Sequence, residues 1–508
     1  MIKTINTRKY NILFIALSIW VTSCRGTDNA ITDDNNNNGT PFNVIVNLTG
    51  AEIEESPLTK TAAIEGPKTS TTGVQQFIVP FDGISNATVT LIPQRSVSGT
   101  QTSINPIAGT PSITELGNNI IYKVAVYRTD GSFVDEKTFT YKTNNTNDQQ
   151  GFMLNGDQTY TFVAYSVNST SVVPAVTNSP RTLATDKLSG INGDLMYFRQ
   201  NMTVSGNGKN YISVVLKHKF TKITTIIDAT GVGNISLVNN ARISPVGTSA
   251  DIKLSDGSLI YNGLGTSAQV LNFKTMGSQK VTSDTNLLIS NNDKNANPAR
   301  LDIGTLIVGG TPQDNFSITD VNITPGNQYN LVVKLGPCRY DKYTRDFNLY
   351  LLNPSTNPGV INTEEMKLDP TDLGLIYDIY KLDDSFNITI NGKKIASSEI
   401  LFGESSGVAF QDGSEYSKNG IPQIWTMEST DKTKPLLRVV INKYGKVSLY
   451  GSKKANDRLY PLVLRNNTFQ DVTWNESGIN TIVSQYTLIG ATSIKGTIRG
   501  IQSTQCTP

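Results

Sequence analysis

Apolar and polar residues alternate along much of the chain from residue 42 onward. In the segment 42–48 the even positions are all apolar and the odd positions are mostly polar, and Gly50 ends the segment. A period of two predicts a β-strand with one buried face. The same signal predicts further strands over 76–79, 87–92, 120–127, 133–141 and 159–167.

Turn signals separate these segments at short intervals. Asp130-Gly131 lies between two strand segments, Asn391-Gly392 follows an apolar run, and Lys443-Tyr444-Gly445 lies between two more. Such dipeptides close tight antiparallel hairpins because their residues tolerate positive φ. No stretch carries a helical period over three turns. The sequence therefore predicts an all-β protein made of antiparallel sandwiches.

Composition supports this fold class, and the length of the chain predicts the number of domains. Charged residues make up 17% of the chain, below the roughly 25% that is usual in globular proteins, and Asn, Thr, Ser and Gly fill the difference. At roughly 150 residues per domain, the part after the N-terminal leader predicts three domains. We place them at 41–180, 190–337 and 338–508, with a polar connection over 168–190.

The N-terminus is typical of an export signal. Lys3, Arg8 and Lys9 precede a short apolar run that ends at Cys24. This pattern resembles the bacterial lipobox, which implies that 1–23 is a signal peptide and that Cys24 carries acyl chains anchoring the protein to the outer membrane. The alternative is an ordinary signal peptide with a chance cysteine. Residues 24–40 are rich in Asn and Asp and predict a flexible stalk.

Two further cysteines remain if Cys24 is lipidated. Cys338 and Cys506 form an even pair, and an exported protein meets an oxidising compartment. We therefore expect a disulfide between them. The alternative is two buried free thiols.

Four phrases in a fixed order resemble the fimbrillin-type lipoproteins of Bacteroidetes; they lie at 122–127, 156–166, 194–197 and 216–220. The resemblance implies two transthyretin-like β-sandwich domains and a role as a pilus subunit or adhesin on the cell surface. In that family, proteolysis after the first strand removes this strand, and a strand of another subunit fills the groove. Lys60 lies where the family pattern would put the basic cleavage residue, although the family residue is often arginine.

The third predicted domain departs from an ordinary polymerising subunit. A disulfide to Cys506 would hold the last strand, so we expect a tip or accessory subunit that accepts a strand and donates none. The phrase at 383–393 resembles carbohydrate-binding jelly rolls, which makes this domain a candidate binding head for a glycan or a protein. Its candidate ligand-binding residues are acidic, amide and aromatic: Asp383, Asp384, Asn391, Tyr416, Trp425 and Trp474. The alternatives are turn chemistry for the polar residues and core packing for the aromatic ones.

Signatures of enzymes and of nucleic-acid binding are absent from the sequence. His218 is the single histidine, so an HExxH zinc site cannot form, and its place in a strand pattern argues against a serine triad. A net charge of +2 without a basic tract argues against nucleic acid. We expect no enzyme, no metal and no cofactor. The alternatives are a stand-alone surface glycan-binding lipoprotein and, less favoured, a glycoside hydrolase that uses carboxylates such as Glu364 and Glu365.

Overall fold

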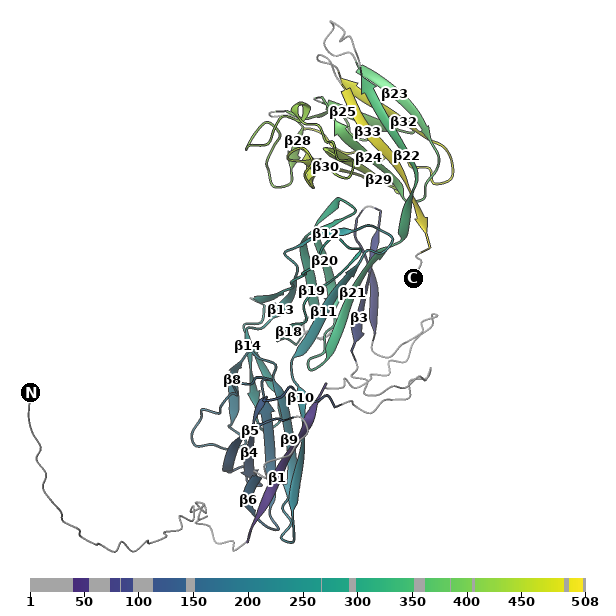
Figure 1. The fold of residues 1–508 in the computed structure, drawn as a ribbon. Helices are drawn as coiled ribbons and strands as arrows, with labels where there is room; N and C mark the ends of the chain where they lie inside the picture. Colours follow the sequence, from purple (N-terminus) through teal and green to yellow (C-terminus); the bar gives the residue numbers. More distant parts are fainter. Residues whose placement is uncertain are drawn as a thin grey trace, which may run out of the picture.

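Three β-sandwiches follow one another in a line (Figure 1). The computed structural model describes residues 40–53, 74–94, 113–142, 151–291, 298–350, 361–403, 407–487 and 493–505, except the single positions 83, 266 and 384. Within these residues the one helical element is the 3-10 turn η1 (Ile424–Thr426). The prediction of an all-β chain with several sandwich domains is confirmed.

The first sandwich is built on a seven-stranded sheet that packs on both faces. One face carries the core around Val124, Phe152 and Phe162, and the other is covered by the three-stranded sheet β15-β14-β8 around Tyr127 and Leu188. The strands in sheet order are β5 (Phe133–Thr140), β4 (Ile121–Arg128), β7 (Thr159–Ser166), β9 (Met196–Thr203), β10 (Asn210–His218), β1 (Pro41–Glu52) and β6 (Gly151–Asn155), with β15 (Leu259–Asn262), β14 (Ser249–Lys253) and β8 (Lys187–Ile191) in the cover.

The two outer strands of this large sheet, β5 and β6, come close together. Lys137 of β5 donates a hydrogen bond from Nζ to the carbonyl oxygen of Gly151 at 2.8 Å. The rings of Phe139 and Phe152 are 6.1 Å apart between centroids. The sheet therefore rolls around its apolar face, which encloses the core.

The second sandwich packs a sheet of order β17-β11-β21-β3-β2 against one of order β12-β19-β13-β16 around one apolar core. β18 pairs with β11 and β20 pairs with β19. The strands are β2 (Gln75–Pro80), β3 (Asn86–Pro93), β11 (Thr221–Asp228), β12 (Ile235–Asn239), β13 (Arg242–Val246), β16 (Ser267–Val270), β17 (Lys280–Thr282), β18 (Asn286–Leu288), β19 (Ala299–Val308), β20 (Thr311–Val321) and β21 (Gln328–Gly336).

The predicted boundary at 180–190 does not match the division into sheets. β2 and β3 come from the predicted first domain but pair in the second sandwich, where β3 runs beside β21. β9 and β10 come from the predicted second domain but complete the sheet of the first sandwich. Alternation along a strand reports which face is buried, not which sheet accepts the strand. The chain order therefore misled the domain prediction.

The third sandwich has a seven-stranded sheet and a smaller sheet that enclose one core. β27 (Ile400–Leu401) pairs with β25 outside the main order. The large sheet runs β22 (Cys338–Tyr350), β33 (Ser493–Thr504), β24 (Gly374–Lys381), β29 (Leu437–Asn442), β30 (Val447–Ser452), β31 (Leu459–Leu464) and β28 (Val408–Phe410), and the smaller one runs β23 (Ile361–Leu368), β32 (Asn480–Thr487), β25 (Ser385–Ile390) and β26 (Lys393–Lys394).

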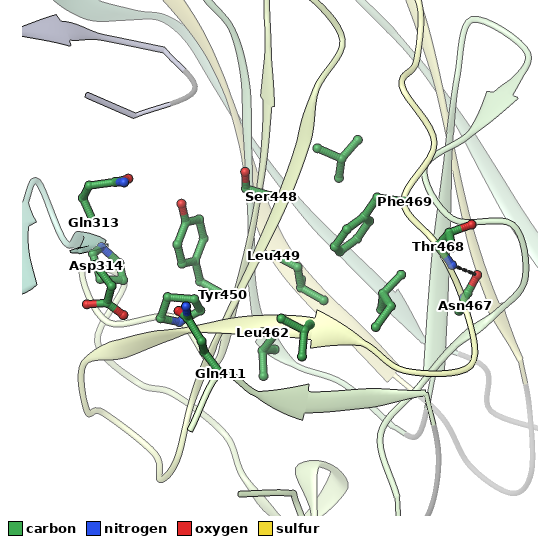
Figure 2. Close-up of a pocket in the computed structure, with 15 residues that line it drawn as sticks. Gln313, Asp314, Gln411, Ser448, Leu449, Tyr450, Leu462, Asn467, Thr468 and Phe469 are labelled. Atoms are coloured by element: carbon green, nitrogen blue, oxygen red, sulfur yellow. Dashed lines mark hydrogen bonds between the residues drawn. The ribbon is translucent and has the colours of Figure 1, made fainter. Parts of the chain in front are cut away.

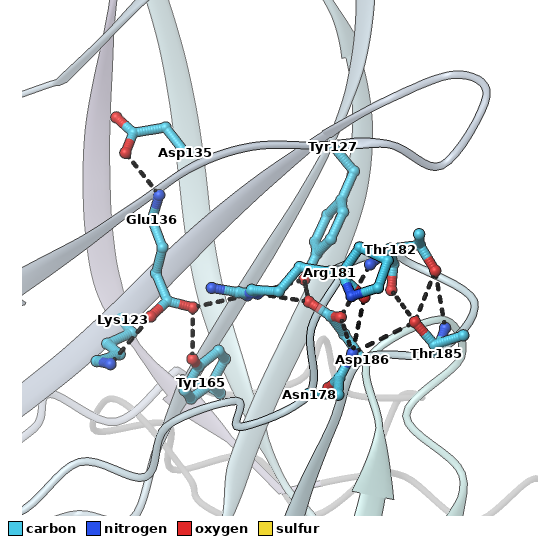
Figure 3. Close-up of polar contacts among 11 residues, drawn as sticks. Lys123, Tyr127, Asp135, Glu136, Tyr165, Asn178, Arg181, Thr182, Thr185 and Asp186 are labelled. Carbon is cyan, nitrogen blue, oxygen red and sulfur yellow. Dashed lines mark hydrogen bonds and ion pairs between the residues drawn. The ribbon is translucent and has the colours of Figure 1, made fainter.

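The segment predicted as a connection, 168–190, is held against the first sandwich by a polar cluster (Figure 3). Arg181 donates to Glu136 at 3.0 Å and to Asp186 at 2.8 Å, and these carboxylates also accept from Tyr165 and Tyr127. Burial, followed by the nearby carboxylates, raises the pKa of both tyrosines above its usual value. Both phenols therefore stay neutral donors, and the segment becomes part of the fold.

A second polar cluster lies where the chain passes from the first sandwich to the second. Asp194 accepts hydrogen bonds from His218 at 2.8 Å, at the end of β10, and from Lys222 at 2.7 Å, in β11. Burial alone would raise the pKa of Asp194, but His218 and Lys222 together lower it to about 2. One carboxylate thus joins β10 of the first sandwich to β11 of the second. This agrees with the prediction that His218 is structural.

Acid is expected to weaken this joint. The pKa of Asp194 is lower in the folded chain than the roughly 3.9 of an unfolded aspartate, so its contribution is present above pH 4 and disappears as the pH falls toward 2. We expect Asp194→Asn to cost about 2 kcal/mol at pH 6. Urea unfolding at pH 6 and at pH 2 measures this, and a penalty that stays unchanged at pH 2 would contradict the assignment.

Candidate functional site

The first strand lies inside the large sheet of the first sandwich. β1 runs parallel to β10, from Val44 beside Asn210 onward, and antiparallel to β6, from Pro41 beside Asn155 onward. Val44, Val46 and Leu48 point into the core and are at most 4% exposed. The predicted apolar row of this strand is therefore confirmed.

Gly50 marks a bulge in β1 rather than its end. The register with β10 shifts between Leu48 and Gly50, and the strand continues to Glu52. Gly50 has φ of 150°, and a Cβ atom there would lie 2.5 Å from the carbonyl oxygen of Thr114. Only glycine fits this point, because the backbone at Thr114, which forms an isolated β-bridge with Ala51, passes too close. The prediction that the strand stops at Gly50 is wrong for this reason.

Within the described residues, β1 is held by backbone hydrogen bonds and by side-chain burial. Burying two valines and a leucine contributes roughly 5 to 9 kcal/mol, at about 1.5 to 3 kcal/mol each. Lys60, the predicted cleavage residue, lies outside the described residues, as do Cys24 and the predicted stalk up to residue 39. Whether the chain is cut after β1 stays a prediction.

The last strand is also an inner strand, in the third sandwich. β33 pairs along its whole length with β22, from Cys338 beside Thr504 to Tyr350 beside Ser493, and on its other side with β24. Cys338 is buried at 3% exposure, and its register partner is two residues ahead of Cys506. Cys506 itself lies outside the described residues, so the disulfide stays a prediction.

The residues predicted to bind a ligand in the third sandwich are not brought together. Trp474 is 7% exposed, lies in the core and donates from Nε1 to the carbonyl oxygen of Thr371 at 2.7 Å. Tyr416 is 1% exposed and donates to Ser452 at 3.1 Å. Both aromatic side chains are therefore core residues, because a sandwich interior needs large apolar groups.

Among the polar candidates, the structure describes Asn391 and Asp383. Asn391 has φ of 50° and Gly392 has φ of 84°, which confirms the tight turn, and the Asn391 amide bonds to Thr473, Asn480 and Thr481. Asp383 precedes β25 and is partly buried, and Asp384 lies outside the described residues. Among the candidates that the structure describes, Trp425 alone exposes a large aromatic surface, at 51%. A ligand role for Asp383, Asp384, Asn391 and Trp425 stays a prediction.

A cavity that sequence patterns did not indicate lies between the second and third sandwiches. It has a volume of about 570 Å³ and is lined by the start of β20 on one side and by β30, β31 and 467–469 on the other. Figure 2 shows Gln313, Asp314, Gln411 and Tyr450 at one end and Leu449, Leu462 and Phe469 at the other. These segments are more than a hundred residues apart in the chain, so no local motif could have revealed the cavity.

A buried ion pair fixes the two walls of this cavity relative to each other. Arg438 of β29 is paired with Asp378 of β24 through bonds of 2.6 and 3.0 Å. Its remaining nitrogen donates to Gly309 at 3.3 Å and to Thr311 at 2.9 Å, both at the turn between β19 and β20. An apolar patch that includes Ile376, Val440, Tyr450 and Ile84 packs in the same joint.

The adjacent carboxylates considered for glycoside hydrolysis do not share a face of their strand. Glu364 and Glu365 are exposed neighbours on β23 and oppose Ser484 and Val483, so their side chains point to opposite faces. No group of three or more His, Cys, Asp and Glu residues suited to a metal ion occurs in the described part of the chain. Over the same residues, no helix has the length and apolar character needed to cross a membrane.

Comparison with known proteins gives only remote likenesses. No protein-family model and no curated protein matches the chain. Among solved structures, a candidate cell adhesion protein of Bacteroides fragilis is 11% identical, with 58% of this chain and 92% of that chain covered and a TM-score of 0.33. The fimbrial anchor protein Mfa2 of Porphyromonas gingivalis is 11% identical, with 59% and 92% covered and a TM-score of 0.31.

A candidate polysaccharide-binding protein of Bacteroides thetaiotaomicron is 13% identical, with 43% of this chain and 83% of that chain covered and a TM-score of 0.29. TM-scores of this size support no conclusion about this chain. The proposals below therefore rest on its own strands and side chains.

Proposed function

We propose that this chain is a fimbrillin-type surface lipoprotein that acts in cell adhesion as a tip or accessory subunit of a fimbria. It accepts a strand from another subunit after its own β1 is removed, and it has no catalytic role. The observation that carries this proposal is that both terminal strands are inner strands of their sheets, so that loss of β1 would open a groove while β33 is held on both sides. β1 is an inner strand at the start of the chain, and β33 is an inner strand at its end.

The seat of β1 has the features that strand exchange requires. Its neighbours β10 and β6 both offer backbone groups, and its apolar row fills a pocket in the core. Removal of β1 would leave two unpaired edges and an apolar groove, which an incoming strand can satisfy through main-chain hydrogen bonds and alternate side chains.

The C-terminal strand supports the idea that the protein donates nothing. Freeing β33 would break its ladders to β22 and β24 and would open the core of the third sandwich at Ile494 and Ile498. A disulfide between Cys338 and Cys506 would add a covalent fastening at the same place. The export route in this proposal is acylation at Cys24 and cleavage near Lys60.

The mature surface form tests this proposal directly. N-terminal sequencing and unreduced peptide mapping of protein released from cells are expected to give a start near Thr61 and a peptide linking Cys338 to Cys506. A blocked Cys24 followed by an intact 41–52 would instead favour the stand-alone glycan-binding lipoprotein. Long homopolymers of this chain alone would contradict the tip or accessory role.

Strand exchange can be tested in the full chain with a specific protease site placed at residue 60. After cleavage we expect a labelled peptide of residues 41–52 to replace the native β1 and to remain bound through gel filtration. The uncut chain is the control and should take up no peptide, because its own strand fills the seat. Equal uptake by cut and uncut chains would show that the peptide binds elsewhere.

A further inference from the structure

The cavity between the second and third sandwiches has walls that combine hydrogen-bonding and apolar surfaces. Asp314 and Gln313 enter from β20, and Gln411 and Tyr450 enter from the third sandwich. The apolar end includes the half-buried ring of Phe469. A volume of about 570 Å³ lies within the range of small-molecule sites, which occur preferentially between domains.

The polar end of the cavity has bonding capacity that the fold does not use. Within the described residues, the side chains of Gln313, Asp314 and Gln411 make no hydrogen bond or ion pair with another residue, and all three are partly or fully exposed. By contrast, Asn467, which also lines the cavity, is engaged with Ser397 and Ser398. Two amides and a carboxylate therefore face the cavity with donors and acceptors available.

Charge limits the kind of molecule that this site can hold. Asp314 is the single charged residue of the lining, and no lysine or arginine contributes to it. Burial, then the carboxylates of Asp82 and Asp314, raises the pKa of Tyr450 to about 12, so its hydroxyl stays protonated at neutral pH. A ligand carrying negative charge would meet a carboxylate and no cation, which disfavours it.

We propose that this cavity binds a neutral carbohydrate. The hydroxyl groups of a sugar match the carboxylate, amide and phenol groups at one end, and the apolar face of a sugar ring matches the Phe469 end. The inference rests on the adhesion role proposed above and identifies the chemical class of the adhesion ligand. It places the binding site at the joint between two sandwiches, away from the predicted residues Asp383 and Trp425.

Because the second and third sandwiches each contribute one wall, the site exists only when both are present in the same chain. The β20 wall is held by the bonds from Arg438 to Gly309 and Thr311, so the two walls are fixed before a ligand arrives. A preformed site loses less conformational entropy on binding. Loss of either wall should therefore weaken binding, which distinguishes this site from one built within a single sandwich.

The test uses the full chain and a defined set of probes: lactose, maltose, cellobiose, and the methyl glycosides of galactose, mannose and N-acetylglucosamine. Saturation-transfer NMR is expected to detect binding of at least one probe, and titration then gives its affinity. Asp314→Ala and Gln411→Ala, which remove acceptors from opposite walls, are each expected to weaken that affinity about tenfold or more. Sialyllactose, which carries a carboxylate, is expected to bind more weakly than lactose.

Tyr444→Ala is the matched control, because it removes an exposed aromatic side chain of the same sandwich outside the cavity. Its affinity should equal that of the unchanged chain. Absence of binding by every probe, or binding that survives both cavity substitutions, would overturn the proposal. Neither result bears on the fimbrial role, since uptake of the 41–52 peptide is measured at the other end of the molecule and can succeed or fail independently.

Discussion

Replacing Asp378 with alanine is expected to lower the free energy of unfolding by about 3 to 5 kcal/mol, the cost of breaking a buried ion pair by removing one partner. Asp378 and Arg438 have side chains that are 2% and 3% exposed, and Arg499 also donates to Asp378 at 2.9 Å. Without the carboxylate, the Arg438 guanidinium remains buried beside Gly309 and Thr311 and lacks a counter-charge.

Equilibrium unfolding in urea measures this effect, and Asp341→Ala is its control. Asp341 accepts from the same Arg499 at 3.4 Å, but its side chain is 38% exposed. A solvent-exposed pair contributes about 1 kcal/mol or less, so the control should lose far less stability than Asp378→Ala. Equal losses in the two variants would mean that burial of the Asp378 pair does not matter. Because Arg438 fixes the cavity walls, Asp378→Ala should also weaken sugar binding.

A strand that takes the place of β1 is expected to need the same alternation of buried apolar residues. In the chain cut at an engineered site at residue 60, a 41–52 peptide carrying Val46→Asp should bind at least about a hundredfold more weakly than the natural peptide, since a buried unpaired carboxylate costs several kcal/mol. Val46 is 4% exposed in the core. Fluorescence anisotropy of the labelled peptides measures the difference.

A second peptide, Gly50→Val, tests the bulge in the same assay. Its side chain would collide with the Thr114 carbonyl oxygen, so it should also bind poorly although it is more apolar than glycine. Asn43→Ser is the control, because Asn43 is exposed. If the valine peptide bound as well as the natural one, the incoming strand would not adopt the register of β1, and partner subunits could not be recognised by this pattern.

Local sequence patterns predicted many of the elements of this protein. The even positions of 42–48 are buried or half-buried as the alternation indicated, and the Asp130-Gly131, Asn391-Gly392 and Gly445 turns each close a hairpin. These features depend on residues within a few positions of one another. Backbone preferences and a period of two are properties of the local chain, so a sequence alone can report them.

Aromatic residues in the third sandwich show where that reasoning fails. Trp474 lies between two polar residues and Trp425 directly follows Ile424, yet Trp474 fills the core and Trp425 is half exposed. The difference comes from the tertiary packing, which places Trp474 in the core cluster and leaves Trp425 outside it. A composition argument could therefore select tryptophan as a candidate ligand residue, but it could not choose between packing and binding.

The sequence by itself determined that this chain folds into β-strands, which faces they bury and where they turn, because those properties follow from neighbouring residues. The tertiary structure alone decided that β1 lies beside β10, that β2 and β3 belong to the second sandwich, and that residues near 314 and 450 share a cavity. These pairings join segments far apart in the chain. Their free energy comes from burial and from ladders of hydrogen bonds that form only when the sheets assemble, so no local pattern contains them.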